Sequence, residues 1–167
     1  MIILQKELKS MSNFVENSIR EETTAIEDFS DHLKELMILN HDTIEKIVLA
    51  TGINNSRLYD YLNNLHIPSL QNAIKIADYY QCSLDFLFGF SDSYTKKHSI
   101  TVEDTCTRVK KAIDGSGKSR YEISKLTNIS QQHLHRWYHG KTVPAIESLI
   151  KLAKALDCSL DYLAGRE

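Results

Sequence analysis

The chain contains one sequence pattern twice. Residues 33–89 lie without a gap on residues 109–165 after a shift of 76 positions. The agreement is best near the ends of the copies, where Cys82-Ser83-Leu84-Asp85 matches Cys158-Ser159-Leu160-Asp161. A repeat of this length suits a small globular domain with its linker and is too long for one solenoid unit. We therefore expect two related domains in tandem.

Composition favours a soluble, cytoplasmic protein without a membrane partner. The 167 residues are 42% hydrophobic, enough for two small cores. No apolar run approaches the roughly 20 residues of a membrane span, and the start lacks the pattern of a signal peptide. The three cysteines form no C-x-x-C pair, so we expect buried thiols rather than a disulfide framework or a zinc site. Phosphate-loop and nucleophile motifs are missing, so we expect neither an enzyme nor a cofactor.

Charge is divided unequally between the halves. Residues 1–92 carry 7 Lys and Arg against 14 Asp and Glu, whereas residues 93–167 carry 13 against 8. Segregated positive charge favours binding of a polyanion by the second half. Simple drift between related domains is the alternative.

Both copies carry only helical signals. In the second copy Ser119 and Glu122 form a capping box, and Asn128 suits a left-handed turn before a third helix that Ser130 caps. A fourth helix is expected from about residue 145 and a fifth after Ser159. The residues expected to face inward include Val102, Cys106, Val109 and Ile113 in the first helix and Ile123 and Leu126 in the second.

Two short helices joined by a tight turn, the second opening with long polar side chains, form the helix-turn-helix pattern. Here the pattern consists of residues 119–127, the turn Asn128-Ile129, and residues 131–142. With Pro144 and the apolar run that follows, this closely resembles the lambda-repressor-like (Cro/repressor, XRE-type) family. The resemblance implies an all-α protein with two five-helix domains, a degenerate one at residues 26–90 and a DNA-binding one at residues 100–167.

The resemblance also implies where the second domain contacts DNA. Base edges would be read by Gln131, Gln132 and Arg136, and phosphates would be held by Arg120, Ser130, Lys141 and Thr142. The chemistry agrees, because glutamine can bond adenine bidentately and arginine can bond guanine in the same way. Leu134 and Trp137 are assigned to the core. His135 and His139 have a spacing that could hold a metal, but no carboxylate or thiolate joins them in sequence, so we place them beside the DNA backbone and expect no metal site.

The first copy lacks most of these contact residues. Arg120 is replaced by Ile44, Arg136 by Asp60 and Lys141 by Leu65. We therefore expect it not to read DNA by the usual face, although Asn55 and Arg57 leave open a protein that reads DNA with both domains. Its apolar residues favour a protein contact surface, with plain divergence as the alternative; the residues are Ile44, Tyr59, Leu62 and Leu65.

The remaining segments have separate roles. Residues 1–25 are expected to form an amphipathic helix, either folded back on the first domain or paired with a second chain. Its apolar positions are Leu4, Leu8, Met11, Val15 and Ile19. Residues 91–99 are polar and are expected to be the linker.

These patterns together predict a sequence-specific transcriptional regulator that binds double-stranded DNA. The family resemblance favours a repressor, and we expect a homodimer that places two second domains on an inverted repeat. The alternative is a protein-interaction adaptor that uses both domains as scaffolds and binds DNA weakly.

Overall fold

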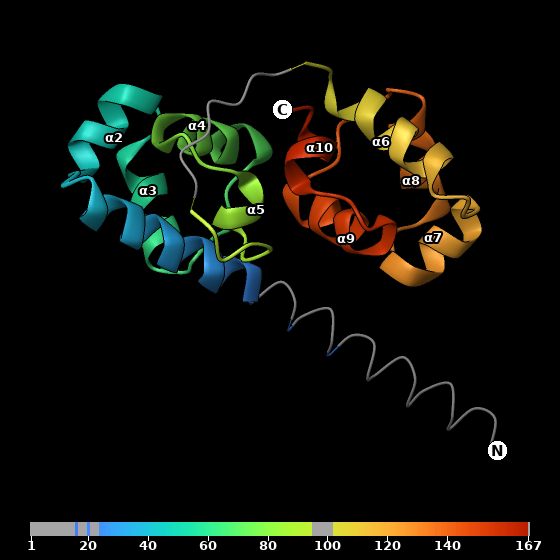
Figure 1. The fold of residues 1–167 in the computed structure, drawn as a ribbon, viewed down its shortest axis with the longest axis horizontal. Helices are drawn as coiled ribbons and strands as arrows, with labels where there is room; N and C mark the ends of the chain where they lie inside the picture. The colour runs from blue at the N-terminus through green and yellow to red at the C-terminus, as the bar shows by residue number, and fades with distance from the viewer. Residues whose placement is uncertain (1–15, 17–19, 21–23, 95–101, 167) are drawn as a thin grey trace.

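The computed structural model describes residues 16, 20, 24–94 and 102–166. Its elements are all α-helices, arranged as two bundles side by side along the long axis (Figure 1). We call residues 24–94 the first copy and residues 102–166 the second copy. The predicted seam Leu4, Leu8, Met11, Val15 and Ile19 lies outside the described residues. So does most of the predicted linker, and the domain boundaries therefore stay predictions.

Each copy consists of five helices in the same order. The first copy opens with helical residues 24–39 and continues with four helices: α2 (Ile44–Thr51), α3 (Asn55–Leu62), α4 (Leu70–Tyr80) and α5 (Leu84–Leu87). The second copy contains α6 (Thr105–Gly115), α7 (Arg120–Thr127), α8 (Gln131–Tyr138), α9 (Ile146–Leu156) and α10 (Leu160–Ala164). The predicted all-α fold is confirmed. Among the described residues, no helix combines the length and apolar character needed to cross a membrane.

Local capping sets the helix starts as the sequence predicts. Ser119 Oγ accepts from the Glu122 amide at 3.2 Å, and the Glu122 carboxylate accepts from the Ser119 amide at 2.7 Å. Asn128 adopts the left-handed conformation, with φ of 56°, that turns the chain from α7 into α8. The first residues of α8 after this turn, Gln131 and Gln132, are exposed.

The apolar core confirms most of the inward positions and corrects two. Leu134 is fully buried and Trp137 nearly so, as expected for core residues. Leu126 is 59% exposed, because the inward stripe of α7 runs from Ile123 to the buried Thr127, whose hydroxyl donates to the Ile123 carbonyl. Val102 is 47% exposed, since α6 begins only at Thr105.

The two copies meet through their last helices. The Asp161 carboxylate accepts from the Leu84 amide at 2.8 Å, and the Asp85 carboxylate accepts from the Leu160 amide at 3.0 Å. Asp85 and Asp161 occupy the same position of the repeat, so each copy caps the final helix of the other. We call these paired bonds the copy contact.

A second pair of interactions flanks the copy contact. Arg166 is 2% exposed and donates to Asp78 of the first copy at 2.7 Å. At the matching positions, Lys154 of the second copy lies 5.6 Å from the ring centroid of Phe90. An ion pair on one side therefore corresponds to a cation–π contact on the other, and both join the two copies.

Candidate nucleic-acid interface

The three predicted base-reading side chains are all exposed on α8. Gln131 and Gln132 form its first turn, and Arg136 follows Gln132 by four residues. Residues four apart share one face of a helix, so the amide of Gln132 and the guanidinium of Arg136 project on the same side. Leu134 and Trp137 hold the opposite side of α8 in the core. The helix can therefore present this polar face without losing its packing.

Cationic side chains lie beside that face. Arg120, at the first position of α7, has its Nη1 3.2 Å from His135 Nδ1, and its guanidinium lies 5.5 Å from the Tyr138 ring centroid. This arrangement links the start of α7 directly to the exposed side of α8. The guanidinium is consequently placed near α8 with an exposed side chain, as a phosphate contact requires.

The other predicted phosphate contacts flank α8 at its two ends. Ser130 caps the start of the helix, where its Oγ accepts from the His133 amide at 3.2 Å. Beyond the end of the helix, Lys141 is exposed and Thr142 is half-buried. The Lys141 amide donates to the Arg136 carbonyl at 2.8 Å, which fixes the loop against the end of α8. The structure thus brings the predicted residues together around one helix, while their contacts with DNA stay predictions.

The two histidines of this face contact each other. The rings of His135 and His139 are 4.3 Å apart between centroids. Desolvation lowers the pKa of His135, and neighbouring His139, Arg120 and Lys141 lower it further. Among the described residues, no group of three or more His, Cys, Asp or Glu side chains could hold a metal ion.

The cysteines behave as buried thiols. Cys82 and Cys106 are buried and Cys158 is half-buried, and none of the three forms a disulfide. Burial raises the pKa of Cys82 to about 12 and the pKa of Cys158 to about 11. Since the thiolate is the nucleophile and the metal ligand, these two thiols are poorly suited to either role.

The first copy presents a different surface on α3. Asn55, Ser56 and Arg57 are exposed in its first turn. The carboxylate of Asp60 lies 3.7 Å from Arg57 Nη1, so the two charges offset each other. The face is therefore polar and close to neutral, whereas the face of α8 is cationic.

The predicted apolar surface of the first copy is smaller than the sequence indicates. Tyr59 is 49% exposed and Leu65 is 62% exposed. Ile44 and Leu62 are only partly exposed, because both pack against the core. Three apolar side chains outside this predicted set are also exposed, namely Ile38 at 74%, Leu39 at 57% and Leu49 at 87%.

Sequence reasoning also missed the residues of the copy contact. Asp85 and Asp161 look like ordinary acidic residues in the first turns of α5 and α10. Burial raises the pKa of Asp161 to about 6, although Arg166 acts in the opposite direction. The available signal was the Cys-Ser-Leu-Asp segment, which is the same in both copies.

The comparisons with known proteins agree with the repeat. A helix-turn-helix family model matches residues 33–87 and again residues 109–163. The two matches are offset by the same 76 positions as the sequence repeat, and together they cover more than half of the chain. No curated protein and no solved structure matches it.

Proposed function

Because the chain belongs to the lambda-repressor-like, XRE-type helix-turn-helix family, whose domain it contains twice, we propose that it binds duplex DNA sequence-specifically through its second copy to regulate transcription. The observation that carries the proposal is the exposed face of α8. Gln132 and Arg136 share that face, and Arg120 lies beside it. Glutamine and arginine match the major-groove edges of adenine and guanine, and adjacent cations match phosphates.

The regulator acts as a repressor by occupying its operator. This role follows from the family resemblance. The predicted homodimer stays a prediction, since the seam of residues 1–25 lies outside the described residues. A second chain could not use the copy contact without separating the two copies, because that surface is already occupied within the chain.

Substitution of Arg136 tests the assignment of roles. Arg136→Ala should weaken specific binding by about 1–3 kcal/mol and relax the preference at one base position. Asp60→Ala, at the matching position of the first copy, should not weaken binding. Affinities of both variants for the same operator, measured by fluorescence anisotropy, check this expectation. Equal losses from the two substitutions would contradict it.

The operator can be identified by selecting, from a random duplex library, the sequences that the full-length protein binds. We expect an enriched sequence that contains a half-site whose selection depends on Arg136. Binding to it should weaken steeply with salt, because the logarithm of affinity falls with a slope of about −0.9 per neutralised phosphate. A salt slope near zero and no enriched sequence would contradict the proposal.

A second candidate function is the protein-interaction adaptor. The exposed apolar side chains of the first copy favour it: Ile38 is 74% exposed, Tyr59 is 49% exposed, and both line one pocket together with Leu62. Exposed apolar clusters mark interaction surfaces. The near-zero salt slope described above is the result that would select this function.

A further inference from the structure

The copy contact has the form of a two-fold interface. In such an interface residue i of one partner meets residue j of the other, and j of the first meets i of the second. Asp85 bonds the Leu160 amide, and its repeat equivalent Asp161 bonds the Leu84 amide. The pairs Arg166–Asp78 and Phe90–Lys154 are related in the same way. The chain thus holds its two copies as the subunits of a two-fold dimer are held.

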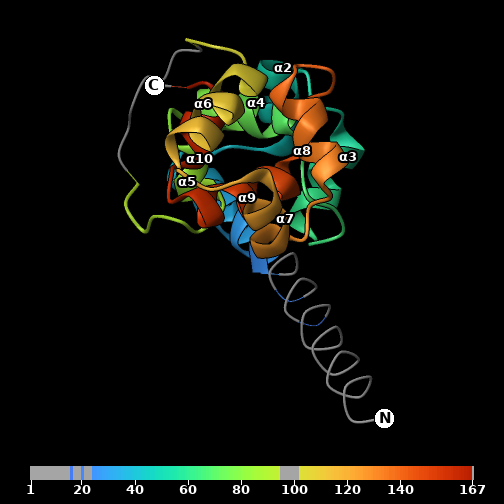
Figure 2. The same cartoon turned by 90° about the vertical axis from the view of Figure 1, so that its right-hand side faces the viewer.

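This arrangement puts both third helices on one side of the molecule. Figure 1 places α3 and α8 toward opposite ends of the long axis, and Figure 2, turned by 90°, shows both displaced to the same side. Helix-turn-helix dimers use such a pair of helices in successive major grooves, about one helical turn apart. Because α3 and α8 lie on the same side, a duplex running along the long axis on that side would meet both helices.

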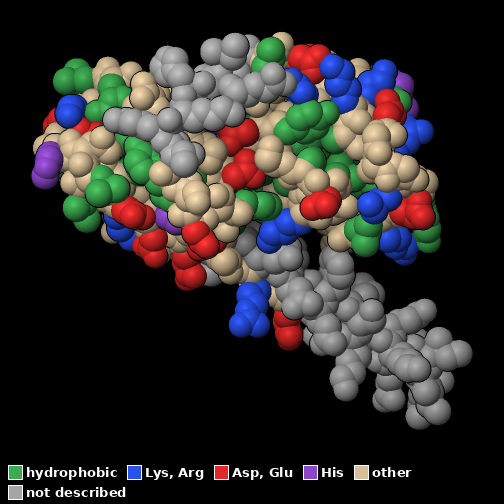
Figure 3. Space-filling model, in the orientation of Figure 1, with side chains coloured by type: hydrophobic (Ala, Val, Ile, Leu, Met, Phe, Trp, Pro, Cys, Tyr) green, Lys and Arg blue, Asp and Glu red, His purple; other side chains and the backbone are tan. Residues whose placement is uncertain are grey.

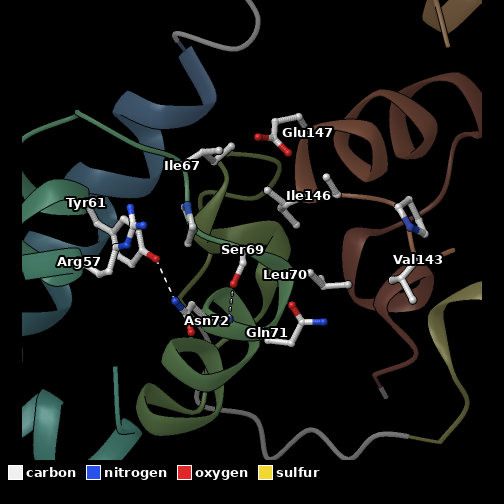
Figure 4. Close-up of a pocket in the computed structure, with 13 residues that line it drawn as sticks. Arg57, Tyr61, Ile67, Ser69, Leu70, Gln71, Asn72, Val143, Ile146 and Glu147 are labelled. Atoms are coloured by element: carbon white, nitrogen blue, oxygen red, sulfur yellow. Dashed lines mark hydrogen bonds between the residues drawn. The ribbon is translucent and has the colours of Figure 1, made fainter. Parts of the chain in front are cut away.

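A groove lies between the two copies. Its volume is about 590 Å³, and the turns that follow α3 and α8 line it from both copies (Figure 4). Leu70 and Ile146 occupy matching positions of the repeat in its lining, as do Pro68 and Pro144. Arg57 from α3 also lines it, which connects the groove to the exposed first turn of that helix. The groove therefore has the same two-fold character as the copy contact.

One sequence-based objection to DNA near the first copy, the negative charge of Asp60, is weakened by the structure. Asp60 lies 3.7 Å from Arg57, so its charge is offset where it would otherwise repel phosphates. Ile44 packs partly against the core and Leu65 is exposed, so neither position supplies a cation for a phosphate, and binding by this copy is expected to be weak. Asn55 meanwhile remains exposed at the start of α3. Its amide has the donor and acceptor needed for adenine.

Much of the acidic excess of the first copy lies on a helix other than α3. Glu27, Asp28, Asp31 and Glu35 all lie in helical residues 24–39. Figure 3 shows acidic side chains along the lower edge of the first copy, where that helix runs, and basic side chains over the second copy. Much of the negative charge thus belongs to a helix other than α3.

We propose that one chain is a covalent pseudo-dimer whose ligand is a bipartite duplex with two unlike, inverted half-sites. The second copy reads one half-site through Gln131, Gln132 and Arg136. The first copy sits over the other half-site and reads it weakly, with Asn55 at a base edge and Arg57 near the backbone. This inference rests on the proposed DNA-binding function.

Footprinting of the full-length protein on its selected operator tests the proposal. Hydroxyl-radical cleavage should show two protected patches about 10–10.5 base pairs apart between centres. Native mass spectrometry of the same complex should show one chain per operator. A single protected patch, or two chains of which each reads one half-site through Arg136, would overturn the inference.

The first copy's part is tested by Asn55→Ala. This exposed substitution should weaken binding to the full operator about tenfold, equivalent to the loss of about 1.4 kcal/mol. Binding to a duplex that carries only the half-site of the second copy should not change. The matched control is Lys75→Ala, which removes an exposed side chain of the same copy from α4 and should leave both affinities unchanged. Unchanged affinity of Asn55→Ala for the full operator would also overturn the inference.

The spacing between the two half-sites distinguishes copies held by the copy contact from copies joined only by a flexible linker. Insertion of five base pairs between the half-sites rotates them by about half a turn. It should reduce affinity to that of the single half-site if the copy contact holds, whereas retained affinity would overturn the inference. Failure of the proposed function itself looks different, because then no operator is selected and Arg136→Ala has no effect.

Discussion

Gly165 tolerates the least change of any glycine in the described part of the chain. Its φ is 82°, and a Cβ there would lie 1.8 Å from the backbone oxygen of Glu103. A Cβ at the matching Gly89 would contact only the side chain of Asp28, with its Oδ2 at 2.5 Å. A side chain can rotate away more easily than a backbone carbonyl, so the two copies differ in their tolerance at one repeat position.

Gly165→Ala should therefore lower the free energy of unfolding by at least about 2 kcal/mol, since left-handed strain adds to the backbone clash. Urea unfolding followed by circular dichroism measures it. Gly115→Ala is the control: no atom lies within 4 Å of a Cβ there, and alanine should raise the free energy of unfolding by up to about 1 kcal/mol. Similar losses from both substitutions would mean that the contact with Glu103 is not the cause.

His135 should make DNA binding depend on pH. Its pKa lies below the ordinary value of 6.5 in the free protein, through desolvation and the neighbouring cations. A nearby phosphate favours the protonated ring, so protons are taken up on binding and affinity should rise as pH falls from 7.5 to 5.5. Anisotropy titrations across this range check the slope. His135→Gln should flatten it, and an unchanged slope in that variant would place the titrating group elsewhere.

Among the helices, α4 and α9 show how the repeat can be used for a matched experiment. Ser69 caps α4 by accepting from the Asn72 amide at 3.3 Å, whereas Ala145 at the equivalent position gives α9 no side-chain cap. The backbone angles of the two capping residues are nearly the same, with φ of −63° and −71°. The second copy therefore lacks one cap that its backbone could accept.

Ala145→Ser should raise the free energy of unfolding by about 1 kcal/mol, within the 0.5–2 kcal/mol range of helix caps. Ser69→Ala should lower it by a similar amount. Thermal or urea denaturation of both variants against the wild type gives the comparison. If Ala145→Ser were neutral while Ser69→Ala cost stability, the missing cap would not limit α9.

The helices were largely predictable because their ends carry local signals. Ser119 and Ser130 cap where the sequence places them, and Asn128 turns as predicted. Leu126 was misplaced because a buried threonine whose hydroxyl bonds within the helix looks polar in a sequence pattern. The predicted contact residues of α8 lie together in the structure. Whether they bind DNA depends on atoms of the DNA, so that part stays a prediction.

At the level of the whole molecule, the copy contact was not predictable from local patterns. Each of its aspartates caps a helix 76 residues away rather than its own. Periodicity and capping rules report on neighbours in sequence, and this contact depends on how two finished bundles pack. Only the matching Asp85 and Asp161 in the best-kept segment of the repeat pointed toward it.

The copy contact should make stability depend on pH. Burial raises the pKa of Asp161 from its ordinary value near 3.8 to about 6, so the folded protein keeps a proton that the unfolded chain releases. The free energy of unfolding should therefore fall as pH rises from about 4 to about 6, by at most about 3 kcal/mol. Other carboxylates titrate in this range, so the informative quantity is the difference between wild type and Asp161→Asn.

Urea unfolding at several pH values between 4 and 7 measures that difference. Asp161→Asn should remove the decline, because the amide does not titrate. Asp92→Asn changes an exposed carboxylate outside the copy contact and should leave the decline in place. A decline that persists in Asp161→Asn would assign it to another group.

Because both copies belong to one chain, dilution affects the occupancy of a paired site differently than it would for two separate subunits. Subunits that associate reversibly come apart below their dissociation constant, and their occupancy of a paired site then rises with the square of concentration. Here the two copies meet through Asp85 and Asp161 within one molecule, so their association does not depend on the protein concentration. Occupancy should rise with the first power of concentration, and the pair stays complete even when a cell holds only a few molecules.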